Sequence, residues 1–166
     1  MKLLFAVLAF VGLGVAVASP PKELSSFELS DQNSVVRKYR FPKPKVTAMT
    51  VADRKGSEQL EPWIKKLYDR YGVRIDIDGV ADVSMIPKPL RGVVSELFRK
   101  RLTHSVMLDW GGSVVGRFGY ERGVANIYVI DRRGCIVKRV TGPANAVGEQ
   151  ELFQAIDRAI DGSPAQ

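Results

Sequence analysis

The chain has 166 residues, a hydrophobic content of 45% and a formal net charge of +7 at pH 7. This length suits one domain with an adequate hydrophobic core. Its basic residues form small groups that we interpret as solvated faces, with weak association with an anionic membrane surface as the alternative. The sequence has no recognisable nucleic-acid-binding motif, which argues against nucleic acid as a partner.

The N-terminal residues have the pattern of a secretory signal peptide. Lys2 is followed by an apolar and glycine-containing run, Leu3–Ala18, which ends in small residues at Ala18 and Ser19. The run is shorter than the ~20 residues that span a bilayer, and an uncleaved anchor is the alternative. We therefore predict a cleaved signal peptide over residues 1–19, one domain over residues 20–166, and a periplasmic or secreted location.

Strand and helix signals then alternate through the first half of the domain. The sequence predicts a strand and polar turn over 27–34, a second edge strand over 35–41, and a buried central strand over 46–52. Apolar residues at helical spacing predict a helix that begins at an N-cap Ser57 and ends at Gly72. The next strand is expected over Val73–Ile77, continuing to Val83 after a break at Asp78-Gly79.

The second half follows the same alternation. Helical spacing between Leu90 and Leu102 predicts a second amphipathic helix, and a short strand is expected over 106–108. Residues 114–120 lead to a hairpin of two strands, 127–130 and 136–140, and a last helix contains Leu152 to Ile160. Strands interleaved with helices, followed by a hairpin and a helix, indicate an α/β fold with a mixed sheet.

Two short motifs resemble a known superfamily. Phe27-Glu28-Leu29-Ser30-Asp31-Gln32-Asn33 resembles the F-x-L-x-D-x-x-G opening of the peroxiredoxin and TlpA/ResA-like branch of the thioredoxin-like superfamily. Gly116–Tyr120 followed by Val124–Ile136 resembles the ending of that branch, F-G-V … V-P-x-x-F-x-I-D-x-x-G-x-I. The resemblance implies a thioredoxin-like mixed sheet flanked by helices in a single domain.

Within that branch, the chain resembles the exported YtfJ-like group. Its central segment A-G-R-x-S-x-x-E stands where redox members have cysteines, and Ala52–Glu58 is the matching stretch here. This loop holds no thiol, and thiol chemistry requires a thiolate. The cis-proline of the family is replaced by Ala125, where a cis bond would cost about 2.5–4 kcal/mol, so a trans bond is expected. Both departures argue against dithiol oxidoreductase activity.

The resemblance and the missing thiols together predict a non-catalytic binding or accessory protein of the cell envelope, without a cofactor. The expected partner is a protein or peptide, and exposed backbone near the family's active-site position could pair with it by strand addition. The candidate binding residues are Asp53, Arg54, Ser57, Gly123, Ala125 and Asn126. A simpler interpretation of Asp53 and Glu58 is that they stabilise a helix N-terminus.

The single cysteine, Cys135, supports an alternative function. It follows Arg132 and Arg133, whose charges could lower the pKa of its thiol in a one-cysteine, peroxidase-like antioxidant enzyme. Its position in a predicted hairpin strand suits a half-buried structural thiol instead.

Neither His104 nor the acidic run predicts a metal site. His104 is the one histidine and lacks a matching ligand cluster, so we interpret it as a cap for the helix that ends near Leu102. The run of Asp76, Asp78 and Asp82 resembles part of a calcium loop, but the twelfth position is Pro87 instead of a glutamate.

Overall fold

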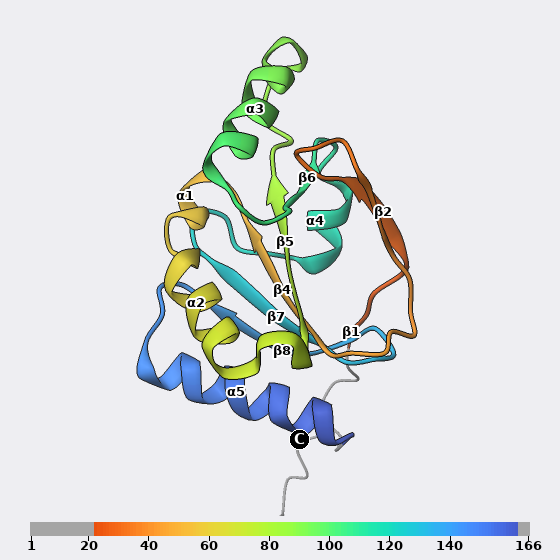
Figure 1. The fold of residues 1–166 in the computed structure, drawn as a ribbon, viewed down its shortest axis with the longest axis vertical. Coiled ribbons are helices and arrows are strands. Elements are labelled where there is room, and N and C mark those ends of the chain that lie inside the picture. Colours follow the sequence, from red (N-terminus) through yellow and green to blue (C-terminus); the bar gives the residue numbers. More distant parts are fainter. Residues whose placement is uncertain (1–21, 163–166) are drawn as a thin grey trace, which may run out of the picture.

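The structure, a computed structural model, describes residues 22–162, and a six-stranded mixed sheet forms its centre (Figure 1). In spatial order the strands are β1 (Lys22–Glu23), β8 (Cys135–Thr141), β7 (Asn126–Ile130), β4 (Thr47–Ala52), β5 (Asp76–Asp82) and β6 (Met107–Asp109). β4 is parallel to β5, and β5 is parallel to β6, whereas β7 is antiparallel to both β4 and β8. The predicted α/β fold with a mixed sheet is confirmed.

Both faces of the sheet are covered. Helices α2 (Leu60–Tyr71) and α5 (Ala146–Asp161) pack on one face, against side chains such as Ala48 of β4 (Figure 1). Helix α4 (Ser113–Phe118) and the hairpin of β2 (Phe27–Ser30) and β3 (Val36–Tyr39) pack on the other, against Met49. Neighbouring residues of a strand point to opposite faces, so the fully buried β4 supplies both cores. All core residues of the described chain lie between Leu24 and Ile156.

Several boundaries differ from the sequence-based prediction. The strand expected from Val73 begins later, at Asp76, because residues Gly72–Arg74 form the short 3-10 helix η1. Strand β5 runs without a break through Gly79, where a Cβ atom would lie 2.9 Å from the Thr50 hydroxyl oxygen. Glycine therefore allows close packing here and does not interrupt the strand. Residues 113–118, for which no element was predicted, form α4.

The turn between β2 and β3 lies along the outer edge of β6. The Gln32 side chain is buried, and its Nε2 donates to the His104 carbonyl (2.8 Å) while its Oε1 accepts from the Val106 N–H (2.9 Å). Asp31 beside it accepts hydrogen bonds from two turn N–H groups, from Arg37 and from Ser105. Burial alone would raise the pKa of Asp31, but these bonds outweigh it and hold the pKa below 3.8.

Two segments connect β5 to β6. The 3-10 helix η2 (Lys88–Leu90) leads into α3 (Arg91–Arg101), and α3 extends away from the sheet (Figure 1). No helix in the described residues is long and apolar enough to span a membrane. The predicted signal peptide over residues 1–19 lies outside them.

Candidate functional site

Asp53 lies at the carboxyl end of the central strand β4 and is fixed by two backbone hydrogen bonds. Its Oδ1 accepts from the Gly56 N–H (2.8 Å), which makes Asp53 the N-cap of the short helix α1 (Arg54–Ser57). Its Oδ2 accepts from the Gly123 N–H (2.9 Å), in the loop before β7. The prediction that Asp53 stabilises a helix start is confirmed. The predicted Ser57 cap is wrong, because the Ser57 hydroxyl donates to the Arg54 carbonyl and α2 begins only at Leu60.

Several backbone N–H and carbonyl groups of the loop before β7 form hydrogen bonds within the protein. The Ala125 N–H donates to Oε1 of Gln59 (3.2 Å), and the Ala125 carbonyl accepts from the Gly142 N–H (2.8 Å). The Val124 carbonyl accepts from the side-chain amide of Asn126 (3.0 Å). Since the Gly123 N–H is bonded to Asp53, a peptide that pairs with this loop competes with these internal bonds. Strand addition at Gly123–Asn126 stays a prediction.

Two of the six candidate binding residues are buried. Ala125 and Asn126 have no exposed surface. The Asn126 amide bonds to both the N–H and the carbonyl of Glu121, and its oxygen also accepts from Arg139 (2.7 Å). Among residues 22–162 the one cis peptide bond precedes Pro42, so the predicted trans bond before Ala125 is confirmed. These two residues hold the loop in place and present no side chain to a partner.

A second cluster, centred on Asp82, adjoins Asp53 and was not predicted. Asp82 ends β5, its side chain is 2% exposed, and it accepts hydrogen bonds from the Tyr120 hydroxyl, Arg122 (3.0 Å) and Ser84. Burial favours a higher pKa, but the bonds from Ser84 and Tyr120 outweigh it and lower the pKa of Asp82. Burial and the neighbouring Asp82 raise the pKa of Tyr120 above its ordinary value of 10.0.

The three aspartates of the acidic run contact different partners. Asp76 pairs with Lys43 (2.8 Å), Asp78 accepts from the Tyr39 hydroxyl, and Asp82 belongs to the cluster above. In the described part of the chain, no group of three or more His, Cys, Asp or Glu side chains is arranged to hold a metal ion.

The exposed charged groups around Asp53 are of both signs. Arg54, Lys55 and Arg122 are exposed, as are Glu58 and Glu121, and the Lys55 side chain passes close to Gly123. The carboxylates of Asp53 and Asp82 instead accept bonds from within the protein. We call this area the Asp53 surface, made up of Asp53, Arg54, Lys55, Ser57, Tyr120 and Arg122. Arg122 is paired with Asp82, so Arg54 and Lys55 are the cations of this surface that suit an anionic group of a ligand.

Cys135 lies at the opposite end of the sheet. It opens β8 beside Glu23, and Ile136 pairs with Ile130, which in turn pairs with Thr47 at the start of β4. With a rise of roughly 3.3 Å per residue along β4, the thiol is about 20 Å from Asp53.

The environment of Cys135 does not activate its thiol. Burial and the neighbouring Asp131 raise its pKa, and the opposing effect of Arg133 is smaller. Arg132 points elsewhere and donates to the carbonyls of Pro44 (3.2 Å) and Ile160 (3.1 Å). The expectation that the two arginines lower this pKa is therefore wrong. The predicted helix cap by His104 is also not found: its side chain is exposed, and no hydrogen bond joins it to α3 within residues 22–162.

Comparisons with known proteins identify the fold. No protein-family model matches the chain, and no characterised protein matches it at the sequence level. Among solved structures, it is similar to a protein of Chlorobium tepidum provisionally assigned as the thiol:disulfide interchange protein DsbE. That match has a TM-score of 0.66 and 18% identity, and it covers 86% of this chain and 98% of the other.

Two further structures show the same likeness. A provisionally assigned thioredoxin from Neisseria meningitidis gives a TM-score of 0.62 at 21% identity, covering 89% of this chain and 95% of the other. The exposed lipoprotein thioredoxin of Streptococcus pneumoniae gives 0.60 at 15% identity, covering 80% and 99%. The fold of this chain is thioredoxin-like, over nearly the whole length of these structures.

Proposed function

We propose that this chain is an exported thioredoxin-fold protein, related to the YtfJ-like group, that binds a partner in the cell envelope without catalysing thiol exchange. The observation that carries this proposal is the position of Asp53. It stands at the end of the central strand, and both of its carboxylate oxygens are bonded to backbone N–H groups. A carboxylate held in this way cannot exchange disulfides, and the chain's one thiol is at the other end of the sheet.

The partner that suits the Asp53 surface is a protein or peptide segment with acidic side chains. Arg54 and Lys55 extend from α1, and Arg122 is held by Asp82 beside them. Because Asp53 and Asp82 fix the backbone and one guanidinium before binding, less conformational freedom is lost when the partner binds. The cationic side chains supply charge-assisted hydrogen bonds to carboxylates.

The first test measures catalysis. Insulin disulfide reduction and peroxide consumption are assayed with the protein and with its Cys135→Ser variant. We expect neither protein to be active above the uncatalysed rate. Turnover that disappears in Cys135→Ser would contradict the proposal and support the alternative, a single-cysteine antioxidant enzyme.

A second test measures binding and location in the cell of origin. A photo-crosslinking residue replaces Arg54, and a control replaces Lys65, which is exposed on α2 away from this surface. We expect defined envelope adducts from position 54 alone, and their loss when Arg122→Glu is added. Identical adducts from both positions would contradict the site. A product retained in the cytoplasm with residues 1–19 intact would contradict export.

A further inference from the structure

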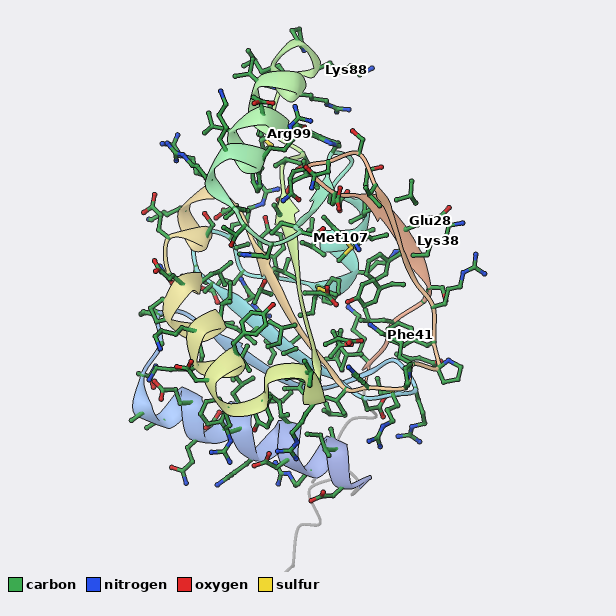
Figure 2. All side chains as sticks on the ribbon, in the orientation of Figure 1. Glu28, Lys38, Phe41, Lys88, Arg99 and Met107 are labelled. Carbon is green, nitrogen blue, oxygen red and sulfur yellow. The ribbon has the colours of Figure 1, made fainter. Side chains whose placement is uncertain are left out.

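Helix α3 is unusual because it contributes no buried residue to the protein. It connects two parallel strands of the sheet, yet none of its 11 residues is buried. The helix and the preceding η2 project from the body, with Lys88 at the far end and Arg99 nearer the sheet (Figure 2). A helix usually gains most of its stability by burying an apolar face, and α3 leaves such a face uncovered.

That face is a continuous apolar ridge. Leu90, Val93 and Leu97 are 51%, 62% and 44% exposed, and Met85 just before them is 78% exposed. Residues at these intervals of three and four lie on one side of a helix. Val94 and Phe98 are half-buried on the neighbouring side, so the apolar arc is wider than the part turned toward the protein. Exposed apolar residues in a contiguous group indicate an interaction surface.

The ridge is flanked by cations. Residues 85–102 contain five basic residues and one acidic residue, Glu96. Glu96 is already paired with Arg99 (2.6 Å) and Lys100 (3.7 Å), and Arg91 lies over the Trp110 ring. The excess positive charge therefore remains at both ends of the ridge, at Lys88 before it and at Lys100 and Arg101 after it.

We propose that α3 docks the protein onto an anionic lipid surface. Leu90, Val93 and Leu97 enter the boundary between headgroups and acyl chains, and the flanking cations contact the anionic headgroups. An apolar ridge bordered by cations is the arrangement of helices that lie in a membrane interface. Helix α3 projects from the body of the protein (Figure 1), and its ridge residues are exposed. This inference uses a different surface from the partner site proposed above and stands independently of it.

Vesicle binding tests the inference. The chain from residue 20 onward, which contains the whole described fold, is sedimented with vesicles of phosphatidylcholine alone or mixed with phosphatidylglycerol. We expect binding to the mixed vesicles only, weakened by high salt because the Debye length shortens. Lys100→Glu with Arg101→Glu should lower the partition coefficient at least roughly tenfold. The control Lys65→Glu with Arg158→Glu changes the net charge equally and should have a much smaller effect.

A site-specific probe separates docking of α3 from general attraction. In the Cys135→Ser background, a polarity-sensitive fluorophore is attached at Leu97→Cys or, as a control, at Val147→Cys, which replaces a side chain 68% exposed on α5. Anionic vesicles should shift the emission at position 97 to shorter wavelength and leave position 147 unchanged. Equal shifts at both positions, no binding, or binding insensitive to the α3 charges would each overturn the inference. If α3 instead bound a protein partner, the protein would not bind vesicles, and the α3 variants would lose the complex with that partner.

Discussion

Three tyrosines in or next to the core show how individual polar groups are accommodated. The hydroxyls of Tyr39 and Tyr120 donate to Asp78 and Asp82, respectively. The hydroxyl of Tyr128 is buried in the described fold without a hydrogen-bond partner, and burial raises the pKa of Tyr128 to about 12. A buried donor without a partner costs free energy that a partnered donor does not.

Tyr128→Phe should therefore stabilise the protein at neutral pH. Removal of an unpartnered hydroxyl, with the ring retained, is expected to raise the free energy of unfolding by about 0.5–1.5 kcal/mol. Tyr39→Phe is the matched control and should lower it by about 1–3 kcal/mol, because Asp78 loses a donor. Urea denaturation followed by fluorescence measures both. A loss of stability in Tyr128→Phe would contradict this account of the residue.

The role of Asp53 could be predicted because the relation is local, whereas the equally local caps expected of Ser57 and His104 are not found. The Asp53 cap lies three residues from the N–H that it binds, and such caps follow from residue type and position. The bond between Tyr120 and Asp82 joins residues 38 positions apart, and nothing in the local pattern of either residue indicates the other. Only the folded sheet brings them together, so the cluster beside Asp53 could not be predicted.

At the scale of elements, the contact between α1 and the loop before β7 defines the candidate site. Gly56 of α1 packs on the backbone of Val124, and a Cβ atom at position 56 would lie 2.2 Å from the Val124 carbonyl oxygen. That oxygen belongs to the backbone and cannot rotate away as a side chain could. Glycine at position 56 therefore allows α1 and the loop to approach closely enough for the Asp53–Gly123 bond.

Gly56→Ala should disrupt this contact. We expect a loss of about 2–4 kcal/mol in the free energy of unfolding, since either α1 or the loop must move. Hydrogen exchange at the Gly123 amide should also accelerate. Gly116→Ala is the control: this exposed helical glycine has open space around its Cβ position, and the change should be neutral or stabilising by up to ~1 kcal/mol. Equal effects of the two substitutions would refute the packing argument.

The elements themselves could be predicted to different degrees. Helices α2 and α5 bury several apolar residues at helical spacing, as the sequence pattern indicates. The pattern of α3 also predicted a helix, but it could not show that the apolar face remains uncovered, because this depends on the direction of the helix. Helix α4 was missed because its six residues are too few to establish a period.

At the scale of the molecule, the ionisable groups set a pH range of stability. The folded-state pKa values of Asp31 and Asp82 lie below the unfolded value of 3.8, so the folded state binds fewer protons in acid. The stability that these two carboxylates contribute is fully present above the unfolded pKa. It is lost as the pH falls through their folded-state pKa values. Tyr71 and Tyr128, raised from 10.0 to about 12, contribute stability that is lost as the pH rises from 10 to 12.

The free energy of unfolding should therefore be nearly constant between roughly pH 5 and pH 9, and should decrease on either side. Denaturation with urea at a series of pH values measures this. Asp82→Asn should make the free energy of unfolding depend less on pH on the acidic side. Tyr128→Phe should have the same effect on the alkaline side. An acidic slope that Asp82→Asn leaves unchanged would show that other carboxylates control unfolding in acid.

The side chain of Gln32 affects association between molecules of this protein at the edge of β6. Its amide accepts from one backbone group and donates to another beside β6, as the peptide group of an added strand would. Free strand edges invite pairing between molecules and thereby aggregation. Gln32 therefore occupies hydrogen-bonding groups at the edge of β6 in place of a further strand. This hinders the edge from pairing with the sheet of another molecule.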